Sequence, residues 1–221
     1  LFLVLSVYGL TGILKAQELK SRTNDVKKSA LILIETQNEW MHPSGKLYPM
    51  ITDKEMFRES VGNIEKTLEY ARRVGMPVIY SGLSFQKGHP ELANGKTGLR
   101  ETIARLGTFP KGDFRSEFYK TVQPIEGEFI STGRTGSSAF AGSNLDIFLR
   151  QNNIGTIYLV GYATNVCVES TFREAQDKGY YPVMIFDATS AFTREQQQYV
   201  LKNIIHHYGE AISTNGFIQL Y

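Results

Sequence analysis

Short apolar runs alternate with segments of helical periodicity along most of this chain. Continuous apolar runs rich in β-branched residues are typical of buried strands, whereas apolar residues recurring every three or four positions indicate amphipathic helices. The pattern predicts strands at residues 30–35, 77–83, 128–133, 156–162, 181–189 and 211–218, and helices at 53–75, 99–106, 143–152, 165–178 and 193–209. This alternation predicts a three-layer α/β/α Rossmann-like fold with a mostly parallel central sheet.

Length and composition fit one globular domain. The chain has 221 residues, of which 42% are hydrophobic and 21% charged. Its formal net charge is only +2, and lysines and arginines are interspersed with acids, so we expect no nucleic-acid partner. The chain contains one cysteine, which excludes an internal disulfide framework and a thiolate cluster for zinc.

The N-terminal segment differs in character from the rest. Residues 1–14 are largely apolar and precede Lys15, Ala16 and Gln17, which suits a secretory signal peptide of residues 1–16. A packed or membrane-anchoring helix is the alternative. With a signal peptide, residues 17–28 form a linker, residues 29–221 form the folded domain, and the mature chain is periplasmic or secreted with no membrane partner. Without one, we expect a cytoplasmic protein.

Three chemically versatile residues follow predicted strands, at the edge where open parallel sheets bind ligands. Glu35 ends the first strand, Arg134 follows the third, and Cys167 follows the fourth, in the first turn of the next helix. Free N–H groups and the helix dipole there can lower the pKa of a thiol. Each residue also has an ordinary interpretation: a small buried side chain for Cys167, a rim carboxylate for Glu35 and a surface cation for Arg134.

Three stretches together resemble one family. They are "ALILIETQNEW", "GRTGSSAFAGSNLDIFLRQNNI" and, most strongly, "LVGYATNVCVESTFREAQDKGYYPVMIFDAT". They are similar to the isochorismatase-like cysteine hydrolase superfamily, which includes nicotinamidases, carbamoyl-amide hydrolases and ureidoacrylate amidases. The resemblance runs from about residue 28 to the C-terminus.

The resemblance implies a role for each candidate residue. Cys167 matches the nucleophile, Glu35 takes the place of an aspartate base, and Arg134 takes the place of the family lysine. The peptide bond between Tyr162 and Ala163 would be cis, and the N–H groups of Ala163 and Cys167 would form the oxyanion hole. The implied reaction is cofactor-free hydrolysis of a small amide-like substrate through a thioester, in a homo-oligomer.

Two further expectations concern the surroundings of this site. Trp40, Phe85, Phe140 and Tyr162 lie near predicted strand ends and could line a substrate pocket, although each is also a plausible core residue. The long segment 84–120 is expected to select the substrate. We expect no metal: His89 has no Asp-x-His beside it, and solvated or packed side chains are the better interpretation of His42, His89, His206 and His207.

Three functions remain in competition. The first is a cysteine-dependent hydrolase that cleaves a small C–N bond. The second is a catalytically impaired ligand-binding or assembly protein on the same fold, which the arginine at position 134 permits. The third is a thiol-based redox protein, which the lack of a resolving cysteine disfavours.

Overall fold

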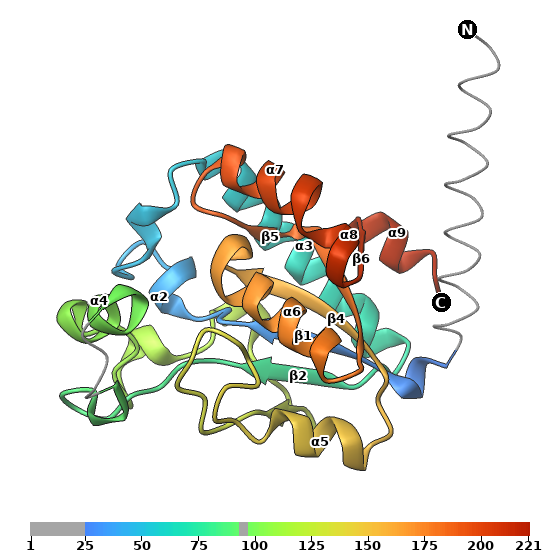
Figure 1. The fold of residues 1–221 in the computed structure, drawn as a ribbon, viewed down its shortest axis with the longest axis horizontal. Coiled ribbons are helices and arrows are strands. Elements are labelled where there is room, and N and C mark those ends of the chain that lie inside the picture. Colours follow the sequence, from blue (N-terminus) through green and yellow to red (C-terminus); the bar gives the residue numbers. More distant parts are fainter. Residues whose placement is uncertain (1–24, 93–96) are drawn as a thin grey trace, which may run out of the picture.

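A six-stranded parallel sheet forms the centre of the molecule (Figure 1). The computed structural model describes residues 25–92 and 97–221, so the expected signal peptide lies outside the described residues. The strand order is β3-β2-β1-β4-β5-β6 and every pair is parallel. The strands are β1 (Ser29–Ile34), β2 (Val78–Ser81), β3 (Phe129–Ile130), β4 (Thr156–Tyr162), β5 (Tyr181–Ser190) and β6 (Glu210–Ile212). The predicted fold class is confirmed.

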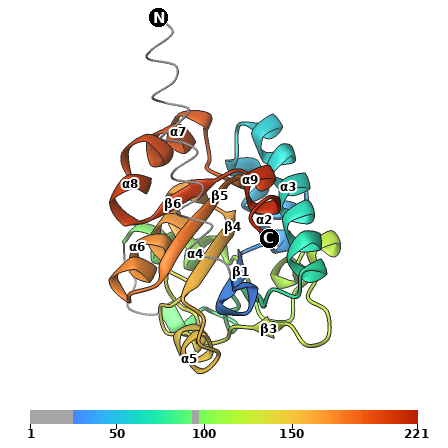
Figure 2. The same cartoon turned by 90° about the vertical axis from the view of Figure 1, so that its right-hand side faces the viewer.

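Helices cover both faces of this sheet, as Figure 2 shows from the end of the strands. The α-helices are α2 (Asn38–Met41), α3 (Lys54–Arg73), α4 (Gly98–Leu106), α5 (Leu145–Gln151), α6 (Glu169–Asp177), α7 (Arg194–Asn203), α8 (Ile205–Tyr208) and α9 (Thr214–Ile218). A π-helical turn spans Thr164–Val168, and short 3-10 turns span Val26–Lys28, Tyr48–Met50, Pro90–Leu92, Phe114–Ser116 and Lys120–Val122. None of the described helices is long and apolar enough to cross a membrane.

The alternation of side chains along β1 explains the two cores. Leu31 and Leu33 pack on the face covered by α3 and α9, while Ile32 and Ile34 pack on the face covered by α5 to α8. Successive side chains of a strand point to opposite faces, so a strand with helices on both sides must be apolar throughout. All six residues of β1 are buried accordingly.

The C-terminal segment corrects one prediction. Only Glu210–Ile212 forms a strand, and the remainder of the expected strand is helix α9. Asp187 Oδ1 accepts hydrogen bonds from the N–H and hydroxyl of Thr214, at 2.7 and 2.8 Å, and Phe217 is fully buried against Tyr158. These long-range contacts hold the segment as a helix. The helix expected at 193–209 is likewise divided into α7 and α8.

The carboxyl ends of the strands converge on one end of the molecule, beyond which α2 and α4 lie (Figure 1, left). Gly161 allows β4 to approach β1 closely there. Its φ is +114°, and a Cβ at this position would lie 2.0 Å from the carbonyl oxygen of Ile34. Glycine is therefore required just before the segment that carries Cys167.

Candidate active site

Glu35, Arg134 and Cys167 come together beyond the carboxyl ends of β1, β3 and β4. Arg134 Nη2 donates to Glu35 Oε1 at 2.6 Å, and both side chains are removed from solvent, with residue exposures of 3% and 1%. Cys167 is 3% exposed, and its thiol interacts electrostatically with both charged groups. The structure thus gathers the three sequence-predicted residues into one buried cluster.

Glu35 is held by a local turn. It follows β1 with a φ of +51°, and its N–H donates to the carbonyl of Ser81 at 3.0 Å. The chain then enters α2, which returns Trp40 to the cluster, where its Nε1 donates to Glu35 Oε2 at 2.8 Å. Each carboxylate oxygen therefore has a fixed donor, and a carboxylate with two donors is oriented for proton transfer.

Arg134 is held in the loop after β3 by a ring of carbonyls. In addition to Glu35, its guanidinium donates to the carbonyl oxygens of Ser81, Gly136, Ser137 and Ser138, at 2.5 to 3.2 Å. Guanidinium offers five N–H donors in a rigid fork, which suits a site lined by several acceptors. A permanent positive charge is consequently fixed beside Glu35.

Cys167 lies in the π-helical turn before α6. Thr171 Oγ1 donates to the carbonyl of Cys167 at 2.7 Å and accepts from the N–H of Ala139 at 2.8 Å. This hydroxyl joins the turn to the loop that carries Arg134. The peptide bond between Tyr162 and Ala163 is cis, and the carbonyl of Ala163 accepts from the N–H of Val168.

The pKa of the Cys167 thiol is raised, whereas its position at the start of a helix suggested that it could be lowered. Burial raises the pKa of the thiol well above its ordinary value, the charge of Glu35 raises it further, and Arg134 opposes both effects. Because desolvation and a neighbouring carboxylate disfavour the thiolate, they outweigh the guanidinium. Burial and Glu35 together therefore favour the protonated thiol of Cys167.

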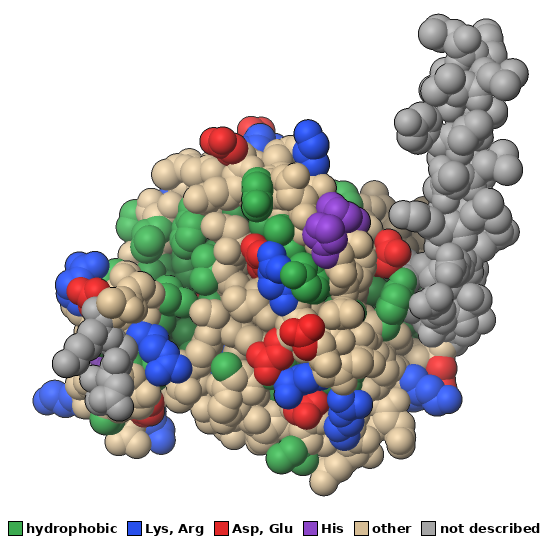
Figure 3. Space-filling model, in the orientation of Figure 1, with side chains coloured by type: hydrophobic (Ala, Val, Ile, Leu, Met, Phe, Trp, Pro, Cys, Tyr) green, Lys and Arg blue, Asp and Glu red, His purple; other side chains and the backbone are tan. Residues whose placement is uncertain are grey.

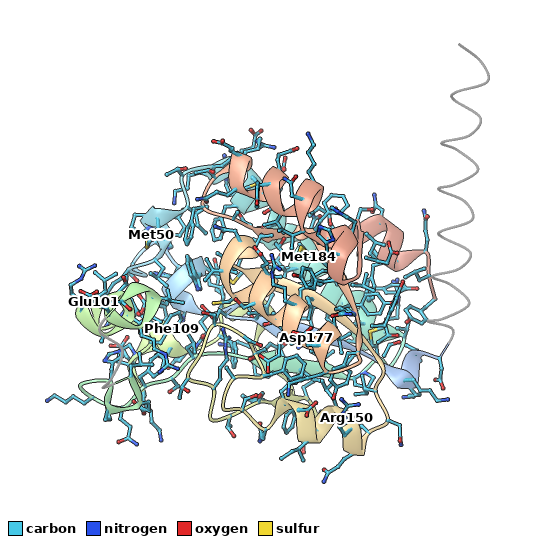
Figure 4. The ribbon with its side chains drawn as sticks, in the orientation of Figure 1. Met50, Glu101, Phe109, Arg150, Asp177 and Met184 are labelled. Carbon is cyan, nitrogen blue, oxygen red and sulfur yellow. The ribbon has the colours of Figure 1, made fainter. Side chains whose placement is uncertain are left out.

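A narrow cavity of about 50 Å³ opens onto this cluster. Glu35, Trp40 and Cys167 line its inner end. Its remaining walls come from five places: the segment around the Tyr48–Met50 turn, the chain after β2, α4 with the chain just after it, the π-helical turn, and the connection between β5 and α7. The residues are Leu47, Met50, Leu83, Leu99, Thr102, Ile103, Leu106, Thr108, Phe109, Val166 and Phe192. Met50 and Phe109 lie at this end of the molecule, near α4 (Figure 4).

Of the four aromatic residues expected to bind substrate, Trp40 lines the cavity. The other three are buried in the core and are not among the residues that line this cavity. Phe85 packs beside His89, Phe140 stacks on Tyr180, and the Tyr162 hydroxyl lies 3.0 Å from Ser60 Oγ beneath α3. Apolar side chains near a strand end can point into either core, and the sequence does not show which.

Two polar residues of α2 and its N-cap shape the site without entering the cluster. Gln37 accepts from the N–H of Leu83 at 2.9 Å and donates to its carbonyl at 2.8 Å. Glu39 is fully buried and accepts from the N–H groups of Lys46 and Phe109. These bonds fix two walls of the cavity. The only sequence signal for them is their proximity to Glu35.

The histidines do not form a metal site. Within residues 25–92 and 97–221, no group of three or more His, Cys, Asp or Glu side chains is placed to bind a metal ion. His89 is buried, and its Nε2 lies 2.8 Å from the carbonyl of Thr108. His42 lies beside Ser44 at the surface, and His206 and His207 are exposed.

A model of the isochorismatase domain matches residues 29–216. The chain belongs to the isochorismatase family. The resemblance noted in the sequence is thereby confirmed, and it extends over nearly all of the described residues.

Several named proteins are similar to this chain over most of its length. Ureidoacrylate amidohydrolase RutB of Agrobacterium fabrum is 29% identical over 202 residues, which cover 86% of this chain and 88% of that protein. N-carbamoylsarcosine amidase of Arthrobacter sp. is 25% identical, covering 95% and 77% respectively. A solved cysteine hydrolase from Pseudomonas syringae pv. phaseolicola superposes with a TM-score of 0.76 at 25% identity, covering 89% of this chain and 93% of that one. These relatives are named as hydrolases, and two of them as enzymes that cleave amides.

Proposed function

We propose that this protein is a cysteine-dependent hydrolase that cleaves a small amide-type C–N bond through a thioester. Cys167 is the nucleophile, Glu35 the general base and acid, and Arg134 a fixed positive charge. The observation that supports the proposal most strongly is that a buried cysteine and a doubly hydrogen-bonded carboxylate line one cavity, while a buried guanidinium pairs with that carboxylate. The amide-cleaving activities named for the relatives support the reaction class.

The reaction begins from a neutral thiol. Because burial and Glu35 raise the pKa of Cys167, the proton leaves the sulfur only as the sulfur attacks. Glu35 accepts this proton while the S–C bond forms. The N–H groups of Ala163 and Cys167 then stabilise the oxyanion of the tetrahedral intermediate. Glu35 returns the proton to the nitrogen, the C–N bond breaks, and the amine or ammonia leaves.

Water completes the cycle. Glu35 takes a proton from the water as its oxygen attacks the thioester carbon, the C–S bond breaks, and Cys167 recovers a proton as the carboxylic acid forms. Arg134 holds Glu35 in place throughout and compensates its charge. Guanidinium remains protonated in proteins, so Arg134 acts by charge and hydrogen bonding rather than by exchanging a proton.

A catalytically impaired binding protein is the second candidate. It is favoured by the hydrogen bonds of Arg134, which are directed to Glu35 and to backbone carbonyls. A guanidinium committed in this way has less freedom to follow charge as it develops during the reaction.

Ammonia release distinguishes the two candidates. Wild type, Cys167→Ala and Glu35→Gln are incubated with a panel of simple carboxamides, ureido compounds and carbamoyl amines. The hydrolase proposal predicts turnover by wild type and a loss of at least about 1000-fold in both variants, because nucleophile and base act as one unit. Binding of a panel compound without turnover would instead identify the protein as a binding protein.

A further inference from the structure

The cavity beside Cys167 is lined mainly by apolar side chains. Apart from Glu35 and Cys167 themselves, its polar side chains are Trp40, Thr102 and Thr108. None of the described residues that line it is a lysine, arginine or histidine. Hydrophobic side chains also gather on the surface between α7 and α4 (Figure 3), and Met50 and Leu99 of the lining are about two-fifths exposed there.

Thr108 provides one hydrogen-bonding group within these walls. The residue is fully buried, and its Oγ1 has no hydrogen-bond partner. Its backbone is already engaged, since its N–H donates to the carbonyl of Ile103 and its carbonyl lies 2.8 Å from His89 Nε2. A buried hydroxyl without a hydrogen-bond partner destabilises the folded protein. A ligand that forms a hydrogen bond with this hydroxyl would remove the destabilisation in the bound state.

The size of the cavity limits what it accepts. One water needs roughly 10–15 Å³, so a cavity of about 50 Å³ holds about three to five groups of that size. That space fits a short, branched acyl chain. Glu35 lines the same space and is already paired with Arg134, and no described lining residue offers a substrate carboxylate a cationic partner.

From this geometry we propose that the substrate is a small, uncharged aliphatic carboxamide, whose acyl chain fills the apolar cavity and whose carboxamide, its one polar group, also hydrogen-bonds to Thr108. The inference rests on the proposed hydrolase function and adds to it a substrate class and a specificity residue. A substrate carboxylate is rejected because it would lose its water, gain no counter-ion and approach Glu35.

A matched pair of amides tests the substrate class. 3-Methylbutanamide and malonamate have the same number of non-hydrogen atoms. The first carries an isopropyl group where the second carries a carboxylate. Ammonia release by the full chain should give a kcat/KM at least about 100-fold higher for 3-methylbutanamide. Equal values, or a preference for malonamate, would overturn this inference and leave the hydrolase proposal standing. If ammonia is released neither from these two compounds nor from any amide of the wider panel, the substrate inference and the hydrolase proposal are both wrong.

Charge introduced at the cavity wall provides an independent check. Thr102 lies on α4 and is only partly buried, so Thr102→Arg is compatible with the helix. This change should reduce the preference for 3-methylbutanamide over malonamate by at least about tenfold, whereas the uncharged control Thr102→Gln should preserve it. The same preference in both variants would contradict the inference.

Thr108 is tested by Thr108→Val with Thr108→Ser as the control. Because Oγ1 has no protein partner, Thr108→Val should leave the melting temperature unchanged or higher, yet lower kcat/KM for 3-methylbutanamide about tenfold. Thr108→Ser keeps the hydroxyl and should stay within about threefold of wild type. Wild-type kcat/KM in Thr108→Val would remove Thr108 from substrate binding.

Discussion

Replacing Glu35 with glutamine should separate the ionisation of Cys167 from its catalytic activity. The carboxylate disfavours the thiolate by repulsion, and it is also the proposed base. In Glu35→Gln the repulsion disappears, and Arg134 loses its anionic partner and becomes available to the thiolate. The sulfur should therefore ionise more readily in a variant that no longer hydrolyses amides.

The size of the effect follows from Coulomb's law. Two unit charges about 4 Å apart repel by about 4 kcal/mol at an effective dielectric constant of about 20. This corresponds to about a 1000-fold change in the thiolate population. A more stable thiolate is a weaker nucleophile, which offsets about half of the gain on a logarithmic scale. Alkylation at pH 7 should thus accelerate about 30-fold.

Iodoacetamide provides the assay, with modification of Cys167 followed by mass spectrometry between pH 6 and 10. The midpoint of the rate profile should move to lower pH in Glu35→Gln. Glu128→Gln is the matched control, because Glu128 also pairs with an arginine, Arg72, but is not among the cavity-lining residues. An unmoved or higher midpoint in Glu35→Gln would refute the electrostatic account of the cluster.

Three further predictions follow. First, the folded state raises the pKa of Cys167, so above about pH 8.5 the folded protein binds more protons than the unfolded chain. In urea unfolding, wild type should therefore lose stability relative to Cys167→Ala as the pH rises above about 8.5. The same pH dependence of stability in both proteins would contradict this. Second, Arg134→Met should destabilise the fold by about 3–5 kcal/mol, and Glu35→Gln combined with it should cost less than the sum of the single variants; additive effects would show that the pair is uncoupled. Third, Trp40→Phe removes a hydrogen bond to a carboxylate worth about 1.5–3 kcal/mol and should lower kcat/KM at least tenfold, so wild-type kinetics would exclude a role for the indole.

The fold was predictable where one local signal determined each element. The apolar run of β4 has the bounds Thr156–Tyr162, as predicted, because every position in it is buried. Asp53 starts α3 as expected, with its side chain accepting from the N–H of Met56. By contrast, α9 depends on Asp187 capping Thr214 and on the burial of Phe217. Contacts between residues so far apart in sequence leave no local signal.

The residues of the candidate site likewise fall into those that the sequence predicted and those that it did not. Glu35, Arg134 and Cys167 were identifiable because each follows a strand of one parallel sheet, and parallel strands end at the same edge. The cavity walls were identifiable only in part, because segment 84–120 was expected to select the substrate and does line the cavity, whereas the segment around Tyr48–Met50 gave no signal. They consist of side chains from α4 and from the segment around Tyr48–Met50, which fold over the edge of the sheet. The sign of the thiol pKa shift also needed the structure, because it is set by burial as well as by neighbouring charges.

Capture of the covalent intermediate tests the central claim most directly. Wild-type protein is mixed with 3-methylbutanamide and with a wider amide panel, quenched in acid during turnover, and examined by intact-protein and peptide mass spectrometry. The account predicts added mass equal to the acyl group of a hydrolysed amide, confined to the peptide that contains Cys167 and removed by hydroxylamine. Ammonia release that persists in Cys167→Ala, or that proceeds with Cys167 unmodified under every quench condition, would contradict it.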